Sequence, residues 1–201
     1  MTRIKICGLL RPQDVAYVNR ARPDWCGFVV NFPKSRRSVT LEQLETLRAG
    51  LDPAVLPVGV FVDAPLGEVT GLLNRGIIAA AQLHGGEGED YTAALRAAAP
   101  GREIWKAFPV RGPADLERAA AFPADRIVLD SGQGTGRTFD WSLLRNFPRP
   151  YLLAGGLTPE NLPAAIRTLR PYGVDLSSGV EMDGFKNFTK IQAAVAAARE
   201  E

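Results

Sequence analysis

The feature that most constrains the fold is a regular alternation of short apolar segments with amphipathic segments along the whole chain. Most of the apolar segments end in Gly, Pro, Asp or Ser, as parallel strands buried on both faces do. They predict eight strands, at residues 4–7, 25–30, 57–62, 77–83, 104–108, 127–129, 151–154 and 174–176.

The segments between these strands have helical patterns. Pro12 is placed for a first helical turn, and Thr40 with Gln43 forms a capping-box pattern. Eight helices are predicted, at residues 12–21, 40–48, 66–74, 90–98, 113–120, 140–146, 159–169 and 186–199. Strict strand–helix alternation indicates a parallel sheet with right-handed crossovers, and eight units favour one closed (β/α)8 barrel spanning residues 1–201.

Composition excludes several kinds of protein. The 201 residues include 24 Lys+Arg and 22 Asp+Glu in mixed order, which gives no basic cluster for nucleic acid. One His and two Cys cannot build a Cys/His zinc site or a disulfide framework, so we expect no metal and a reducing compartment. No apolar run approaches the ~20 residues of a membrane span. The N-terminus lacks a signal-peptide pattern, so a cytoplasmic protein without membrane association is expected.

Alternation along the first strand places Lys5 and Cys7 inside the barrel and Ile4 and Ile6 against the helices. Barrel active sites lie at the carboxyl ends of the strands, where Cys7 falls. Lys5 could lower the pKa of that thiol and so make it a base. Buried Cys is also a common small apolar residue, so both interpretations of Cys7 stay open, whereas Cys26 is predicted to be core.

A carboxylate closes the apolar strand before the Gly-rich loop at residues 132–138. Asp130 is costly to bury unless it is paired or used, which favours a general acid over a turn-capping Asp. The following loop is rich in Gly but has Arg137 where a dinucleotide motif needs Gly and a P-loop needs Lys. We therefore expect a flexible loop over the site.

Two Gly motifs end consecutive strands, Gly155-Gly156 and Ser178-Gly179. Barrels often bind phosphate with the loops after strands seven and eight, because Gly lets backbone N–H groups approach the oxygens. Together these motifs predict a phosphate site.

Other polar residues fall at strand ends. His84 follows the fourth strand, where a structural role and a substrate hydrogen bond are about equally expected. Arg36 and Arg37 follow the second strand, and one of them could pair with a substrate carboxylate.

Several motifs, in order along nearly the whole chain, resemble the phosphoribosylanthranilate isomerase family. They include Lys5-Ile6-Cys7-Gly8-Leu9, Pro33-Lys34-Ser35-Arg36-Arg37, Gln82-Leu83-His84-Gly85, Leu129-Asp130, Ala154-Gly155-Gly156-Leu157-Thr158-Pro159-Glu160-Asn161 and Val174-Asp175-Leu176-Ser177-Ser178-Gly179-Val180-Glu181. The sequence departs from the family pattern at Leu10, Gln133, Asp183 and Asn187, the last of which could still cap the final helix.

The resemblance implies an Amadori rearrangement in tryptophan biosynthesis, in a single (β/α)8 barrel without metal or cofactor. Cys7 matches the general base and Asp130 the general acid. Substrate-binding roles are implied for Arg37, which matches the residue that holds the anthranilate carboxylate, and for His84 and Asp175. The phosphate grip corresponds to Gly155, Gly156, Ser178 and Gly179. The partner implied is a small phosphorylated substrate, bound by a monomer or a homodimer.

Two other functions fit a phosphate-binding barrel. An aldolase would use a Schiff-base lysine, for which Lys106 on the fifth strand is the candidate. A binding protein without catalysis would bind the ligand and be indifferent to replacement of Cys7.

Overall fold

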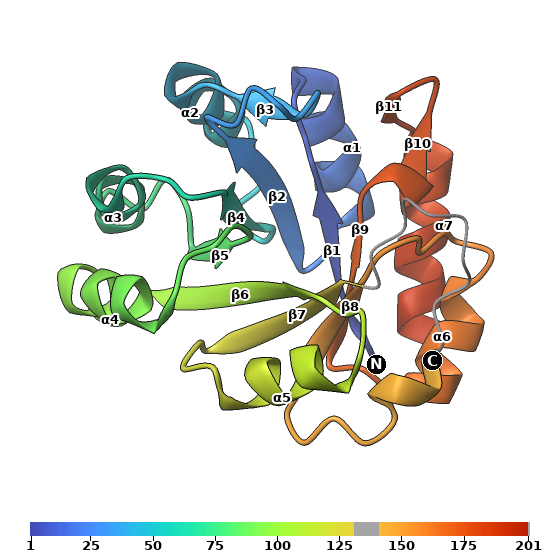
Figure 1. Ribbon diagram of the computed structural model, residues 1–201. Coiled ribbons are helices and arrows are strands. Elements are labelled where there is room, and N and C mark those ends of the chain that lie inside the picture. Colours follow the sequence, from blue (N-terminus) through green and yellow to red (C-terminus); the bar gives the residue numbers. More distant parts are fainter. Residues whose placement is uncertain (131–140, 201) are drawn as a thin grey trace.

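Eight parallel strands close into a barrel (Figure 1). The computed structural model describes residues 1–130 and 141–200. The barrel strands are β1 (Arg3–Cys7), β2 (Trp25–Val30), β4 (Leu56–Phe61), β5 (Ala80–Leu83), β6 (Glu103–Pro109), β7 (Arg126–Asp130), β8 (Tyr151–Ala154) and β9 (Gly173–Leu176). Closure comes from β1, which pairs in parallel with both β2 and β9.

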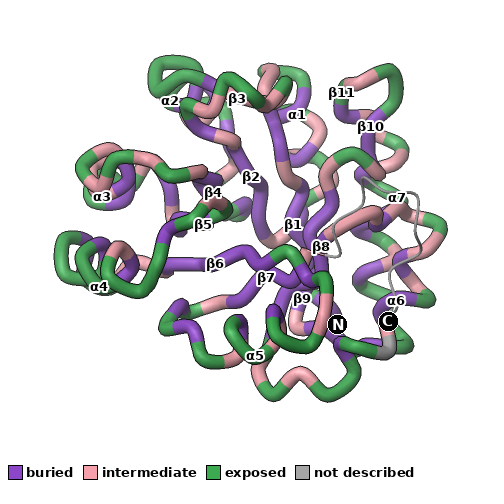
Figure 2. The backbone as a smooth tube through the Cα atoms, in the orientation of Figure 1, coloured by how far each residue is buried: buried purple, intermediate pink, exposed green. Residues whose placement is uncertain are grey.

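The helices surround the strands and expose their outer faces (Figures 1 and 2). The described residues form α1 (Pro12–Ala21), α2 (Leu41–Ala49), α3 (Leu66–Asn74), α4 (Glu89–Ala98), α5 (Pro113–Ala121), α6 (Leu162–Leu169) and α7 (Phe188–Glu200). In that same part of the chain, no helix is both long enough and apolar enough to cross a membrane.

Local sequence signals set the helix starts. The Thr40 hydroxyl accepts from the backbone N–H of Gln43, whose side chain accepts from the Thr40 N–H, which confirms the capping box. Pro12 begins α1 as predicted. Asn187 caps α7 by accepting from the Lys190 N–H, so this departure from the family pattern preserves the function of a cap.

Two apolar clusters make up the core. The larger cluster lies between the strands and the helices and includes Ile4 and Ile6, while a smaller one fills the barrel. Inside the barrel, Trp25 and Trp105 pack edge to face with ring centroids 5.2 Å apart. At this amino-terminal end of the strands, Arg126 donates to Glu103 in two hydrogen bonds of 2.9 and 2.7 Å and closes the barrel floor.

Some predicted boundaries were wrong for identifiable reasons. The strand predicted at 77–83 begins only at Ala80, because Ile77 and Ile78 donate their backbone N–H groups to Leu72 in the turn that ends α3. The helix predicted at 159–169 begins at Leu162, since the preceding residues form the loop that Asn161 fastens.

The last predicted helix, at 186–199, also starts late, and a short hairpin precedes it. Lys186 belongs to β11 (Phe185–Lys186), which pairs with β10 (Glu181–Met182). A further short strand, β3 (Ser38–Val39), pairs with β2. Two-residue strands carry no detectable periodicity, so the sequence could not predict them.

The helix predicted at 140–146 is, within the described residues, only the 3-10 turn Trp141–Leu144. Residue 140 itself and the Gly-rich loop that contains Gln133 and Arg137 lie outside the described residues.

We expect Trp105→Ala to lower the free energy of unfolding by about 3–5 kcal/mol, because the side chain is fully buried and its removal leaves a cavity in the barrel. Urea unfolding followed by circular dichroism measures this loss. Leu56→Ala is the control, since Leu56 is 45% exposed and should change stability by no more than about 0.5 kcal/mol. Equal losses in the two variants would contradict the packing of Trp105 inside the barrel.

Candidate active site

A cavity of about 490 Å³ opens at the carboxyl ends of the strands. Of the nine residues predicted for the site, eight line it: Cys7, Arg37, His84, Asp130, Gly155, Gly156, Asp175 and Ser178. The ninth, Gly179, lies just behind the lining, against the Leu157 carbonyl. Barrel closure therefore collects residues from six different strand ends.

Cys7 lies at the end of β1, directly above Lys5 on the inner face of the strand. A Cβ placed on Gly27 of β2 would lie 2.7 Å from the Cys7 Sγ and 3.1 Å from the Lys5 Nζ. Only Gly therefore leaves room for the thiol and the ammonium side by side. The Ser177 hydroxyl donates to the Cys7 carbonyl at 3.1 Å and ties β1 to the end of β9.

Lys5 and Asp175 form a buried ion pair beneath the cavity. The Lys5 Nζ donates to Asp175 Oδ2 at 2.7 Å, and the Lys5 side chain is fully buried. Burial alone would lower the Lys5 pKa, but Asp175 and Cys7 raise it, so the ammonium stays charged. The other oxygen, Asp175 Oδ1, is buried and has no hydrogen-bond partner among the described residues.

The thiol of Cys7 is less acidic than the sequence suggested. Burial raises its pKa, and Lys5 opposes this effect as predicted without overcoming it. This shift disfavours the thiolate form of Cys7. Deprotonation needs either higher pH or a positive charge brought by a ligand.

Asp130 lies at the end of β7, with β8 and β9 between it and the strand of Cys7. His84 approaches it, with Nε2 3.9 Å from Asp130 Oδ2, a distance longer than a hydrogen bond. Burial lowers the pKa of His84 although Asp130 opposes the shift, so the imidazole is neutral at pH 7.

Gln82 is a lining residue that the sequence did not single out. It precedes His84 by two residues and therefore points into the barrel on the same face. Its Nε2 lies 3.4 Å from His84 Nδ1. Its Oε1 is buried without a partner among the described residues. The signal available was the inward alternation along β5, which places Gln82 and His84 on one face.

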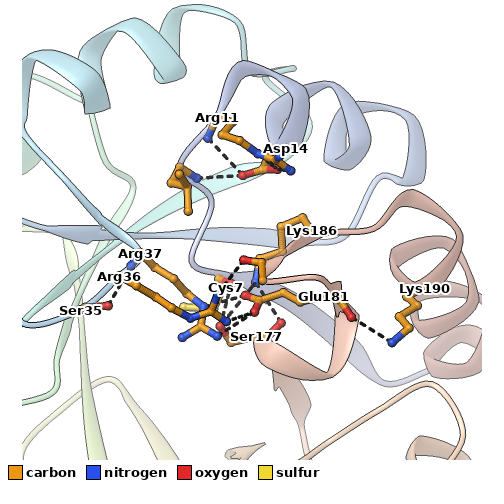
Figure 3. A network of polar contacts seen from close by, with 12 residues as sticks. Cys7, Arg11, Asp14, Ser35, Arg36, Arg37, Ser177, Glu181, Lys186 and Lys190 are labelled. Atoms are coloured by element: carbon orange, nitrogen blue, oxygen red, sulfur yellow. Dashed lines mark hydrogen bonds and ion pairs between the residues drawn. The ribbon is translucent and has the colours of Figure 1, made fainter.

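Arg37 reaches the cavity from the loop after β2. Its Cδ lies 2.4 Å from where a Cβ of Gly8 would stand, so only Gly at that position, with φ +80°, lets the arginine stem pass. The guanidinium pairs with Glu181 of β10 (Figure 3). Arg36 pairs with Glu181 too, but its side chain is 54% exposed and it does not line the cavity, so of these two arginines Arg37 belongs to the site.

The two Gly motifs shape one side of the cavity. Gly155 and Gly156 have φ values of +92° and +61°, which favour Gly. Asn161 fastens their loop by donating to the Gly156 carbonyl at 3.0 Å and accepting from the Thr158 N–H at 2.8 Å. A Cβ on Gly179 would lie 1.8 Å from the Leu157 carbonyl oxygen, so this Gly allows the two loops to touch.

The aldolase alternative is wrong on geometry. Lys106 faces the helix layer, on the same side of β6 as Ile104 and Phe108 and opposite to Trp105. Its Nζ contacts Glu87 at 3.0 Å and the Gly85 carbonyl at 2.7 Å, and it does not line the cavity. A substrate in the barrel mouth therefore cannot reach this lysine.

Within residues 1–130 and 141–200, no group of three or more His, Cys, Asp or Glu side chains is arranged to hold a metal ion. The chemistry available at the cavity is thus that of a thiol, a carboxylate, a neutral imidazole and an arginine, beside two loops suited to an anion.

Comparison with known proteins places these features in a family. The profile described as N-(5'-phosphoribosyl)anthranilate (PRA) isomerase matches residues 4–197. An N-(5'-phosphoribosyl)anthranilate isomerase from Thermoanaerobacter sp. (strain X514) is 38% identical over 202 residues and covers 97% of both chains.

Solved structures agree over the full length. Monomers of a dimeric phosphoribosylanthranilate isomerase from Thermotoga maritima superpose with a TM-score of 0.86 at 36% identity, covering 100% of both chains. A phosphoribosyl anthranilate isomerase in complex with reduced 1-(o-carboxyphenylamino)-1-deoxyribulose 5-phosphate gives a TM-score of 0.86 at 35% identity, again with 100% of both chains covered.

We expect iodoacetamide to alkylate Cys7 at a rate that rises with pH through an inflection above ~8.5, the ordinary thiol pKa. The reason is that burial raises the Cys7 pKa and only the thiolate reacts. Peptide-level mass spectrometry of the native protein reports the rate. Cys26 is the internal control, since it is fully buried and should stay unmodified. An inflection well below 8.5 would contradict the analysis of Cys7.

Proposed function

The chain belongs to the N-(5'-phosphoribosyl)anthranilate isomerase family, and we propose that the cavity residues described above carry its reaction. The activity is the Amadori rearrangement of N-(5'-phosphoribosyl)anthranilate to 1-(2-carboxyphenylamino)-1-deoxyribulose 5-phosphate, a step of tryptophan biosynthesis. The observation that carries the residue assignment is that one cavity holds Cys7 and Asp130 on different sides, with Arg37 and the Gly loops at its edge.

The two charged ends of the substrate fix its position. The phosphate binds to the loops that contain Gly155, Gly156, Ser178 and Gly179, where backbone N–H groups can approach its oxygens. The anthranilate carboxylate binds to Arg37, because a guanidinium fork matches a carboxylate in geometry and charge. The ribose then lies between Cys7 and Asp130.

The reaction begins at the ribose ring oxygen. Asp130 donates a proton to this oxygen as the C1′–O4′ bond breaks, and the anilinic nitrogen supplies the electron pair that forms the C1′=N⁺ iminium. His84 lies beside Asp130 as a neutral imidazole and can donate or accept a hydrogen bond as the carboxyl changes charge.

Cys7 acts on the open-chain intermediate. Its thiolate removes the proton from C2′, and the C2′–H electrons flow into the iminium to give an enolamine, which tautomerises to the ketone. The iminium charge lies next to the thiol and favours its ionised form, as an opposite charge does for any acid. This accounts for a base whose pKa is raised by burial: Lys5 and the substrate charge both act against that effect.

The unpartnered acceptors on the cavity floor fit the sugar. Asp175 Oδ1 and Gln82 Oε1 are buried and lack donors among the described residues. Ribose hydroxyl groups are donors, and binding them removes the cost of two unsatisfied buried acceptors. We therefore assign hydroxyl binding to Asp175, for which a substrate-binding role was predicted, and to Gln82 in addition.

The protein acts as a monomer or a homodimer on a small phosphorylated substrate. No cofactor is needed, because the substrate iminium is itself the electron sink.

We place the protein in the cytoplasm, where thiols such as Cys7 and Cys26 stay reduced.

Cys7→Ala and Asp130→Asn should each lower kcat by about 10²–10⁴-fold, since each removes a proton-transfer group without removing a charged anchor of the substrate. The loss of substrate fluorescence measures turnover, and circular dichroism checks folding. Cys26→Ala is the matched control and should keep kcat within about threefold, because Cys26 faces the outer core.

Full activity in either site variant would refute the role of that residue. A folded wild-type protein that does not turn over phosphoribosylanthranilate would refute the reaction itself. Binding without turnover, unaffected by Cys7→Ala, would instead favour the binding-protein alternative.

Gly179→Ala should raise KM for the phosphorylated substrate by about tenfold or more, because the new methyl group would displace the Leu157 carbonyl and part the two phosphate loops. Steady-state kinetics measures this change. Gly67→Ala is the matched control, since nothing lies within 4 Å of its Cβ position on the exposed side of α3. An unchanged KM for Gly179→Ala would refute the phosphate assignment.

A further inference from the structure

Glu181 is a buried carboxylate at the cavity mouth to which the reaction above gives no role. It is 8% exposed and comes from β10, in the hairpin that follows the phosphate loop. Three cationic side chains contact it: Arg36, Arg37 and Lys186 (Figure 3). Burying such a carboxylate costs desolvation free energy that can exceed what its ion pairs return. Its geometry is therefore expected to serve a function other than stability.

The contact with Arg37 is a two-point pair. Arg37 Nε donates to Glu181 Oε1 at 2.6 Å and Arg37 Nη2 donates to Oε2 at 2.9 Å. This pairing occupies one edge of the guanidinium and two of its five N–H groups. The side-chain N–H groups of the outer edge, on Nη1 and Nη2, have no hydrogen bond to the described residues, and Arg37 lines the cavity.

The carboxylate is itself held from behind. Lys186 Nζ donates to Glu181 Oε1 and to the Ser177 carbonyl, both at 2.9 Å, and the Lys190 Nζ donates to the Glu181 carbonyl at 2.9 Å. These contacts fix the hairpin to the end of β9 and to α7. Glu181 is therefore a rigid support, in contrast to a mobile surface counterion.

The charges also favour an incoming anion. Burial works to raise the pKa of Glu181, but hydrogen bonds and charges from Arg37 and Lys186 outweigh it and lower the pKa to about 2, so the carboxylate is ionised at any working pH. Three cations around one anion leave positive charge in excess. A second carboxylate can thus bind Arg37 without displacing the first.

We propose that Glu181 is a positioning residue, which holds one edge of Arg37 so that the opposite edge receives the carboxylate of the substrate's aromatic ring. The inference rests on the proposed function and deepens it. Glu181 does not touch the substrate; it makes the protein select an aryl amine that carries an ortho carboxylate over one that does not. A guanidinium that is already held in its binding orientation loses less side-chain entropy on binding than that of a free arginine.

The test compares two ligands that differ in one group. The first is reduced 1-(o-carboxyphenylamino)-1-deoxyribulose 5-phosphate, and the second is the same compound with a phenyl ring in place of carboxyphenyl. Calorimetric Kd values for both ligands give the carboxylate preference of each protein as a ratio. A residue that only stabilised the hairpin would weaken both ligands alike and leave this ratio unchanged.

Glu181→Gln should reduce the carboxylate preference by about 10-fold or more, the order of one hydrogen bond to a charged group, while Kd for the phenyl ligand changes little. The matched control is Glu103→Gln, which removes an equivalent two-point pair with Arg126 at the other end of the barrel. This control should keep the wild-type preference. Arg37→Met should abolish most of the preference, and adding Glu181→Gln to it should cause no further loss.

A folded Glu181→Gln protein with the wild-type preference overturns the proposal, and so does a further loss of preference in the Arg37→Met background. Should Glu181→Gln not fold, Glu181→Asp is measured instead. This variant keeps the negative charge but moves it one methylene away from Arg37, so it should also reduce the carboxylate preference. A wild-type protein that prefers the carboxylate ligand yet shows no turnover refutes the isomerase reaction alone. A wild-type protein without the preference overturns both the Arg37 assignment and this proposal.

Discussion

Closure of the sheet through β1 is the constraint on which the rest of this structure depends. Because β1 pairs with β9 on one side and β2 on the other, all eight parallel strands must end at one mouth. Closure also turns the alternate residues of each strand into the barrel interior, where Trp105 is fully buried. The polar groups that point into this space must then be paired with each other or used on a ligand.

The charges at the mouth follow that rule in two tiers. In the lower tier, Lys5 and Asp175 neutralise each other, which leaves one oxygen of Asp175 without a hydrogen bond to the described residues. In the upper tier, Glu181 is surrounded by cations and supports Arg37. In both tiers a buried ion pair orients a side chain, Asp175 or Arg37, that can still form hydrogen bonds to a substrate. The protein thus uses buried ion pairs, which contribute little net stability as a class, to orient its binding groups.

Much of the fold followed from local signals, and the errors came where local signals conflict with distant ones. Seven of the predicted helices are helices, because their caps and amphipathic spacing are properties of neighbouring residues. Ile77 and Ile78 were assigned to a strand because apolar β-branched residues are typical of strands. In the structure they belong to the turn after α3, and their side chains are apolar because they pack on the outer core, a contact that no local pattern predicts. The hairpin of β10 and β11 was missed for the converse reason: it exists through contacts made by Glu181 and Lys186.

The sequence by itself determined the strand–helix rhythm and which residues of each strand face inward. These properties depend on the period of the backbone, and they were enough to bring Cys7, Asp130 and the Gly loops to one end of the barrel. Only the tertiary structure decided the electrostatics of the site. The pKa of Cys7 reflects the balance between burial and Lys5, and the orientation of Arg37 reflects Glu181, which is 144 residues away in the chain. Such balances depend on distances through space, which the linear order of residues does not contain.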